Sequence, residues 1–203
     1  MGKKQAVGND RARRVLAQEA ARIIVEQGIQ DYRIAKTKAA ERLGMRERGS
    51  LPGNNEIEHA VAEHLQIFRG DSHRNLLQSL REAALSAMEL LSPFTPRLVG
   101  PVLAGTAAEH SPVNLHVFAD SAEQVAFRLQ QGGIAYKPFE RRYKSRKGRS
   151  QCYAAFAFMH GDSAIEATVF PFDGIRQAPM SPVDGKPMRR ADQAKVRAML
   201  EED

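Results

Sequence analysis

Residues 105–118 read GTAAEHSPVNLHVF, and this stretch decides how the second half of the chain is expected to fold. A Gly-Thr turn and a polar spacer lead into VNLHVF, residues 113–118, where valine and leucine occupy every second position. Successive side chains of a strand point to opposite faces, so this alternation predicts a half-buried strand. The face away from the core then carries Asn114, His116 and Phe118.

The residues that follow this strand predict the rest of an α+β domain. Residues 121–133 read SAEQVAFRLQQGG, in which Ser121 and Gln124 form a capping box and two glycines end a helix. A short apolar strand is also expected before the opening stretch, at residues 98–105. Runs rich in aromatic and β-branched residues then predict three further strands. These candidates span residues 134–143, 151–160 and 164–172.

The first half of the chain has a different composition and predicts helices. Residues 1–97 hold three of the thirteen aromatic residues, and their apolar residues recur with helical spacing. The helix with the clearest pattern begins with Asn55 and Glu58, which resemble a capping box. The four helices are expected at residues 11–27, 31–43, 55–69 and 73–91.

A proline-rich segment, SPFTPRLVGP at residues 92–101, predicts the boundary between the two halves. We therefore expect a helical domain over residues 1–97 and an α+β domain over residues 98–178. Residues 179–203 are expected to form a loop and a short helix.

The overall composition indicates a globular protein with a basic surface. The net charge is +6 and the isoelectric point is near 9.7, which permits a polyanionic partner such as RNA or nucleotide phosphates. No apolar run is long enough to span a membrane and the basic N-terminus lacks an apolar segment, so a cytoplasmic protein is expected. The single cysteine, Cys152, lies in an apolar strand candidate and is expected in the core.

The order of strand, small turn, spacer, alternating strand and capped helix resembles the nucleotidyltransferase superfamily, which has the polymerase-β-like fold. That family carries an apolar residue, Gly-Ser, a spacer, and two acidic residues at i and i+2 on a strand. Here Gly105 and Thr106 match the Gly-Ser, and Ser111 matches the serine that often precedes the acidic pair. The pair itself falls on Pro112 and Asn114. The resemblance covers residues 98–172.

The resemblance implies a mixed sheet flanked by helices and a nucleotide site formed by Gly105, Thr106, Ser111, Asn114 and His116. In the family, three carboxylates on neighbouring strands hold Mg²⁺ ions that activate the attacking hydroxyl. Proline and asparagine have replaced the acidic pair here, so standard metal-dependent transfer is expected to be lost. The expected function is nucleotide or RNA binding in a regulatory role, with no metal site.

Two alternatives stay open at this point. Glu166, on the strand candidate AIEATVF, matches the third acidic position and could serve an active transferase that uses Mg²⁺ and a displaced carboxylate. The chain could also be a nucleic-acid-binding adaptor without a nucleotide pocket. Neither the oligomeric state nor the ligand follows from the sequence.

A basic segment between two strand candidates favours a phosphate-bearing partner. Residues 137–149 read KPFERRYKSRKGR, in which cations outnumber the one acidic residue and two aromatic residues are interleaved. Basic loops bind phosphate backbones and adjacent aromatic rings can stack on bases. The other interpretation is a solvated hairpin whose charges protect a sheet edge. The predicted nucleic-acid-binding residues are Lys137, Arg141, Arg142, Lys144, Arg146, Lys147 and Arg149.

Overall fold

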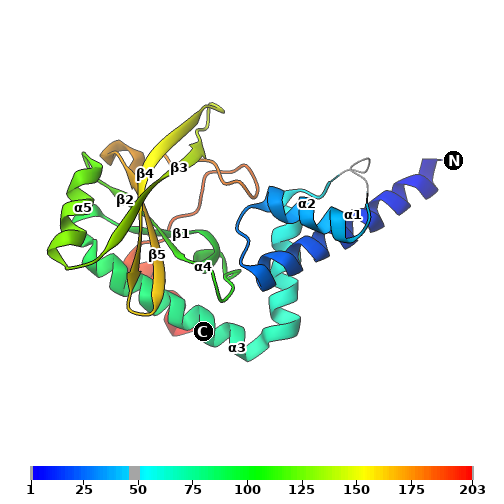
Figure 1. Ribbon diagram of the computed structural model, residues 1–203, viewed down its shortest axis with the longest axis horizontal. Coiled ribbons are helices and arrows are strands. Elements are labelled where there is room, and N and C mark those ends of the chain that lie inside the picture. Colours follow the sequence, from blue (N-terminus) through cyan, green and yellow to red (C-terminus); the bar gives the residue numbers. More distant parts are fainter. Residues whose placement is uncertain (1, 46–50, 203) are drawn as a thin grey trace. The chain divides into compact units, whose positions relative to one another are not determined.

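The computed structural model describes residues 2–45 and 51–202 and divides into two compact units (Figure 1). We call them the helical unit and the sheet unit. The helical unit comprises Met1–His73, Ala108–His110 and Pro182–Asp184. The sheet unit comprises Arg74–Ala107, Ser111–Ser181 and Gly185–Asp203. This division differs from the one predicted at residue 97, because the helix after residue 73 packs its apolar side chains against the sheet.

The helical unit is built from α1 (Gly2–Gln27), α2 (Tyr32–Arg42) and the first part of α3 (Asn54–Leu90). α2 buries only alanines, which let its backbone approach its neighbours closely. α1 and α3 fill the remaining core with larger side chains. The apolar residues of this core include Ile23, Ile57, Val61, Leu65, Ala35 and Ala39.

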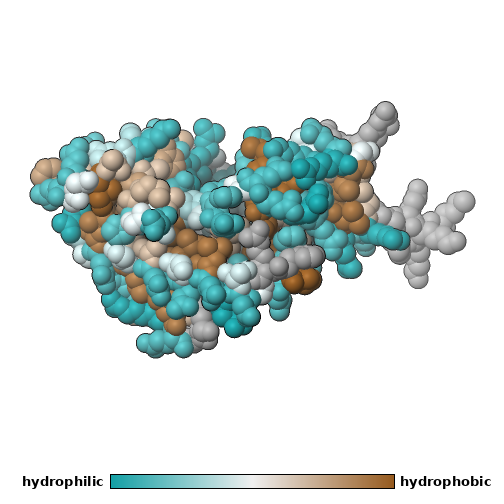
Figure 2. All heavy atoms as spheres, turned by 60° about the horizontal axis from the view of Figure 1, so that its bottom comes forward, coloured by the Kyte–Doolittle hydropathy of each residue, from teal (hydrophilic) through white to brown (hydrophobic). Residues whose placement is uncertain are grey.

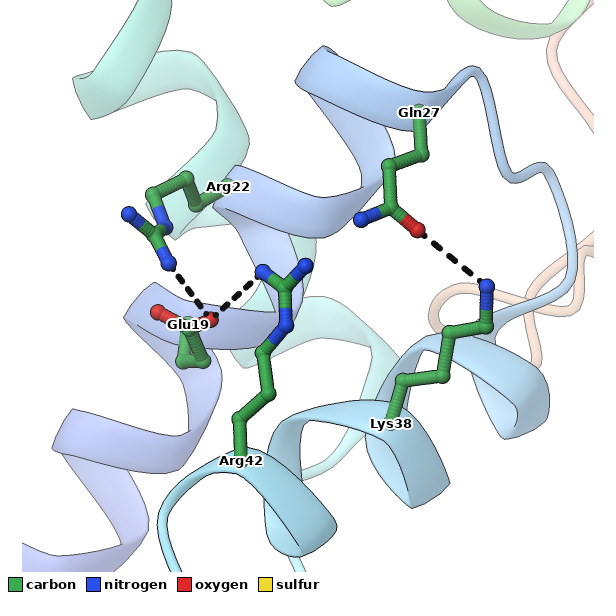
Figure 3. A network of polar contacts seen from close by, with 5 residues as sticks. All are labelled: Glu19, Arg22, Gln27, Lys38 and Arg42. Carbon is green, nitrogen blue, oxygen red and sulfur yellow. Dashed lines mark hydrogen bonds and ion pairs between the residues drawn. The ribbon is translucent and has the colours of Figure 1, made fainter.

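Polar contacts join α1 to α2 on the surface of the helical unit (Figure 3). The Glu19 carboxylate accepts hydrogen bonds from Arg22 at 3.0 Å and from Arg42 at 3.1 Å. Burial alone would raise the pKa of the Glu19 carboxyl, but these two arginines leave it below its ordinary value. Lys38 donates to Gln27 at 3.2 Å. Two cations of α1 and α2 are thus engaged with one carboxylate.

Replacing Asp31 with alanine is expected to lower the free energy of unfolding by about 1 kcal/mol. The Asp31 side chain caps α2 by accepting from the backbone N–H groups of Arg33 at 2.7 Å and Ile34 at 3.3 Å. Urea unfolding followed by far-ultraviolet circular dichroism measures the loss. Asp31→Asn keeps an acceptor and is the matched control; an asparagine variant as unstable as the alanine variant would contradict the capping role.

The helices predicted at residues 55–69 and 73–91 correspond to the two parts of α3, which a kink separates. Gly70 lies at the kink, with φ 22° and ψ −109°, outside helical values. A glycine tolerates these backbone angles, which interrupt the helix at this position. The capping contact lies two residues earlier than predicted. The Glu56 carboxylate, rather than that of Glu58, accepts a hydrogen bond from the backbone N–H of Gly53 at 2.6 Å.

The sheet unit contains a five-stranded mixed sheet, as the predicted α+β class requires. The strands lie in the order β1-β2-β5-β4-β3, in which β2 and β5 are parallel and the other neighbours are antiparallel. Their bounds are β1 Arg97–Val99, β2 Val113–Phe118, β3 Tyr136–Lys144, β4 Ser150–His160 and β5 Ser163–Phe170.

One face of this sheet packs against the second part of α3 and against α5 (Ala122–Gln131), and the other carries polar side chains. The packed face buries Leu98, Leu115, Val117, Ile165 and Phe156 together with leucines of the two helices. All six residues of β2 are buried, so the prediction of a half-buried strand at residues 113–118 is wrong. β2 lies between β1 and β5, and the side chains of its second face, Asn114, His116 and Phe118, are buried as well.

The segment predicted as a strand at residues 98–105 is a strand only at its start. β1 ends at Val99, and α4 (Gly100–Ala104) follows at once. Pro101 occupies the first turn of α4, where its missing N–H costs nothing and its fixed φ favours a helix. The strand pattern of the apolar residues was overridden by this proline and by Gly100.

Two smaller predictions also need correction. Ser121 precedes α5 as expected, but its side chain makes no hydrogen bond to the backbone of the first turn. Cys152 is exposed on β4, where it pairs with Arg142 of the edge strand β3. The remaining elements are the 3-10 helices η1 (Ser92–Phe94) and η2 (Phe172–Ile175) and the C-terminal helix α6 (Gln193–Glu202).

The surface mixes hydrophilic and hydrophobic atoms over the side shown in Figure 2. The large apolar side chains that are exposed include Ile34 and Ile67 in the helical unit and Phe127, Met159 and Phe172 in the sheet unit. Over residues 2–45 and 51–202, no helix combines the length and the apolar character needed to cross a membrane.

Candidate functional site

The second face of the sheet carries a cluster of polar side chains, which we call the polar face. The strand register places Asn114 opposite Glu166 and His116 opposite Thr168, so these four side chains lie on one face of β2 and β5. Arg141 and Tyr143 reach them from β3, and Arg190 reaches them from the segment before α6. The polar face therefore consists of Asn114, His116, Arg141, Tyr143, Glu166, Thr168 and Arg190.

Arg141 connects three strands through its guanidinium. It donates to the Asn114 amide oxygen at 2.6 Å and forms an ion pair with Glu166. To do so it crosses β4, where the residues that pair with Thr168 and Glu166 are the small Ala155 and Ala157. About a quarter of each charged side chain of the pair is exposed, at 25% for Arg141 and 22% for Glu166. The only carboxylate of the polar face is thus neutralised by an arginine.

The start of α4 packs directly against Asn114. Val99 pairs with Asn114 in the sheet, and Gly100 follows with φ +74°, a value that L side chains rarely adopt. A Cβ atom at Gly100 would lie 3.3 Å from the Asn114 amide nitrogen. That nitrogen donates to the carbonyl of Pro112 at 3.1 Å. Backbone conformation and close approach both favour glycine at position 100.

His116 is fully buried and its two ring nitrogens have different partners. Nδ1 accepts a hydrogen bond from the Nε–H of Arg190 at 3.0 Å, so the ring proton belongs on Nε2, which lies 3.1 Å from the Tyr143 hydroxyl. Burial lowers the pKa of His116 well below its ordinary value of 6.5, and the positive charges of Arg190 and Arg141 lower it further. The imidazole is therefore neutral at physiological pH.

Arg190 is held over His116 by contacts on several sides. Its Nη1 donates to the carbonyl oxygens of Gly174 at 2.7 Å and Ile175 at 3.3 Å. Its guanidinium carbon lies 5.0 Å from the ring centre of Phe118 and 5.2 Å from that of Phe170. Burial lowers the pKa of Arg190 to about 10.

The backbone next to Arg190 explains its direction. Ala191 exchanges hydrogen bonds with Leu98 of β1 at 2.8 and 2.9 Å, so this short segment extends the sheet beyond β1. Ala191 and Leu98 belong to the apolar core. Neighbouring residues of an extended chain point to opposite faces, which directs Arg190 to the polar face.

The structure brings four of the predicted site residues together: Asn114, His116, Arg141 and Glu166. The others of the predicted nucleotide site lie on the connection from α4 to β2. There Gly105 ends α4 with φ +80°, and Thr106 donates its backbone N–H to Pro101 at 3.0 Å, while Ser111 lies two residues before β2. Six predicted cations are exposed on the β3–β4 hairpin: Lys137, Arg142, Lys144, Arg146, Lys147 and Arg149.

Sequence reasoning missed Gly100, Tyr143, Thr168 and Arg190 as parts of the site. Tyr143 and Thr168 could have been found by counting alternate positions along their strands, once the strand pairing was known. The doublet Arg189-Arg190 follows a loop-like segment without periodicity, so nothing in the sequence distinguishes the inward-facing arginine from the exposed one.

The donor set of the polar face suits hydrogen bonding and anion binding better than metal binding. Among the residues that the structure describes, no three His, Cys, Asp or Glu side chains are placed to hold a metal ion together. Two arginines, Arg141 and Arg190, belong to the polar face, and a third, Arg97, pairs with His116 from β1, whereas Glu166 is the single carboxylate of the polar face. Comparison of this chain with protein families, curated proteins and solved structures gives no match.

Proposed function

We propose that this protein is a nucleotidyltransferase-like protein that binds a nucleotide or RNA on its polar face without metal-dependent transfer. The topology supports this proposal: a short strand antiparallel to β2 leads into a short helix, and β5 lies parallel to β2 on its other side. Fold similarity alone does not imply activity, so the proposal depends on the residues of the polar face.

The register of β2 supports a refined match to the family motif. Val99 ends β1 and Gly100 begins α4, where the family has an apolar residue followed by Gly-Ser, with Pro101 in place of the serine. The two neighbouring positions of β2 on the polar face are Asn114 and His116, because Pro112 precedes the strand. Glu166 then lies beside Asn114, where the family has its third acidic residue.

The observation that carries the proposal is the position of the Arg141 guanidinium between Asn114 and Glu166. Mg²⁺ in such sites is held by several oxygen ligands, chiefly carboxylates. Here an amide and a neutral imidazole replace two of them, and the remaining carboxylate is paired with Arg141. These residues do not fit a Mg²⁺ site, so the cation that the ligand phosphates meet is an arginine.

Edge strand β3 supports a ligand that contains bases as well as phosphates. Its side chains on the polar side alternate between cations and aromatic rings, in the order Lys137, Phe139, Arg141 and Tyr143. The Arg141 guanidinium lies 5.5 Å from the Phe139 ring centre. The rings of Tyr143 and of Tyr153 on β4 pack edge to face, with their centres 6.0 Å apart. Aromatic rings beside cations stack on bases while the cations contact phosphates.

ATP, or a short single-stranded oligoribonucleotide, is expected to raise the melting temperature equally with Mg²⁺ and with EDTA. A ligand at about 100 times its dissociation constant adds about 2.7 kcal/mol to the free energy of unfolding. Differential scanning fluorimetry measures the shift. Stabilisation that strictly requires Mg²⁺ would contradict the proposal and favour the active transferase.

The Glu166→Gln variant further distinguishes ligand binding without transfer from active nucleotidyl transfer. Glu140→Gln is the matched control, because Glu140 is an exposed carboxylate of β3. Ligand binding should survive both substitutions. A nucleotidyl-transfer activity that is present in the control and absent in Glu166→Gln would show that Glu166 is catalytic.

A further inference from the structure

Arg190 is a half-buried cation without an acidic partner. Its hydrogen bonds go to His116 and to two backbone carbonyls, and no ion pair joins it to a carboxylate of the described chain. Removing a charge from water is unfavourable unless an opposite charge or a full set of hydrogen bonds compensates it. Hydrogen bonds and two aromatic rings nevertheless hold this guanidinium in place.

Hydrogen-bond donors around Arg190 are left without acceptors. Its Nη2 is buried and makes no hydrogen bond within the described residues. The Tyr143 hydroxyl oxygen accepts a hydrogen bond from the Nε2–H of His116, so the hydroxyl can donate its own O–H to another group. The Thr168 hydroxyl, 1% exposed and opposite His116, likewise lacks a hydrogen-bond partner among these residues. Three hydrogen-bond donors near His116 therefore have no acceptor among the described residues.

A second guanidinium lies near the first. Arg97 of β1 pairs with His116 in the sheet register and is close enough to Arg190 to lower the pKa of that group. Within the described chain, the Arg97 guanidinium donates to the carbonyl oxygens of Thr95 and Pro96, at 3.4 and 3.0 Å, and to no other group. Two neighbouring cations repel each other unless an anion lies between or beside them.

We infer that Arg190 and Arg97, with the hydroxyl of Tyr143, form the receptor for a phosphate group of the ligand. This inference rests on the proposed function and assigns its phosphate to one end of the polar face, beside β1. A phosphate offers several acceptor oxygens and matches the fork of a guanidinium, so it can accept hydrogen bonds from the two arginines and the Tyr143 hydroxyl together. Tyr143 and Tyr153 are half-buried neighbours of Arg190.

The test compares binding of inorganic pyrophosphate, ATP and a single-stranded oligoribonucleotide by calorimetry. Arg190→Gln and Arg97→Gln are each expected to weaken binding about tenfold or more, as the loss of a hydrogen bond to a charged group implies. Arg189→Gln is the matched control, because Arg189 is the exposed neighbour with the same charge. It should change the dissociation constants by less than about twofold, as a remote charge does.

Each outcome decides the inference. Unchanged nucleotide and RNA affinity in folded Arg190→Gln and Arg97→Gln overturns the inference and leaves the proposed function intact. Arginine-dependent binding of pyrophosphate without binding of ATP or RNA supports the receptor and overturns the proposed function. No binding of any probe by the unmodified protein overturns both. If Arg190→Gln does not fold, Arg97→Gln decides, because the hydrogen bonds of the Arg97 guanidinium go to two carbonyls of the residues just before it.

Discussion

Acidification from pH 6.5 to about pH 5 is expected to reduce the free energy of unfolding by as much as about 2 kcal/mol through His116 alone. The folded protein holds His116 neutral, because burial and the charges of Arg190 and Arg141 lower its pKa well below 6.5. The unfolded chain has an ordinary histidine that takes up a proton as the pH falls through 6.5. Because the unfolded state then binds more protons, stability is complete above this pH and decreases below it.

The groups that face His116 all oppose its protonation. Arg190 donates to Nδ1, Arg141 lies on the same face, and Arg97 occupies the paired position on β1. Tyr143 offers its hydroxyl, which is neutral in this pH range and gives an added charge no counterion. Within the described chain, the hydrogen bonds and ring contacts of His116 involve Tyr143, Arg190 and Phe170, and no carboxylate. The folded state therefore has no low-cost way to accommodate a protonated His116.

Unfolding in guanidinium chloride, at a series of pH values, measures the contribution of His116 to the free energy of unfolding when the parent protein is compared with His116→Gln. Glu19 and Glu56, whose carboxyl pKa values lie below the ordinary one, also lose stabilising interactions in acid. Their effect is shared by both proteins and cancels in the difference. His59→Gln, at an exposed position of α3, is the matched control and should keep the pH dependence of the parent. An equal slope in the parent and in His116→Gln would contradict the assignment.

The elements of the sheet unit could be predicted because their local signals agree with their environment. The alternation of VNLHVF places Asn114 and His116 on one face, and the structure confirms this placement. The helix predicted within residues 121–133, which is α5 (Ala122–Gln131), and the three strands after it also lie where their sequence patterns predicted them. Period-two and period-3.6 patterns carry this information, because each reports which side of one element is buried.

The composition of the site could be predicted only in part, because it depends on pairing between distant segments. Arg141 belongs by sequence to a basic hairpin, yet it reaches Asn114 and Glu166 across β4. It can do so because alanines occupy positions 155 and 157, which matters only once β4 is known to lie between β3 and β5. Arg190 comes from a segment without periodicity, and its direction follows from the pairing of Ala191 with Leu98.

Neutralising four cations of the β3–β4 hairpin is expected to weaken RNA binding by a few hundredfold at about 0.1 M salt. The substitutions are Arg142→Gln, Arg146→Gln, Lys147→Gln and Arg149→Gln, all at exposed positions. Each cation that contacts a phosphate of a single strand contributes about 0.7 to the slope of log K against log salt, so the slope should fall by about 3. Arg141 is left unchanged, because it belongs to the polar face.

The turn that carries these cations should keep its structure in the variant. Ser145 donates to the Arg149 carbonyl at 2.8 Å, and Gly148 donates to the Ser145 carbonyl at 2.9 Å. These bonds involve backbone atoms only, and Gly148, with φ +74°, is unchanged. Arg146, Lys147 and Arg149 are thus presented on an ordered turn and Arg142 on β3, so their replacement is expected to change charge rather than conformation.

A control variant with the same loss of charge separates a local effect from a general one. Arg11→Gln, Arg14→Gln, Arg33→Gln and Lys195→Gln also lower the net charge from +6 to +2, at exposed positions outside the hairpin. Fluorescence anisotropy with a labelled single-stranded oligoribonucleotide, over a series of salt concentrations, measures affinity and slope for both variants. Equal losses in the two variants would mean that net charge alone attracts RNA. Full affinity in the hairpin variant would mean that RNA binds elsewhere, whereas loss confined to it assigns the phosphate backbone to the hairpin beside the polar face.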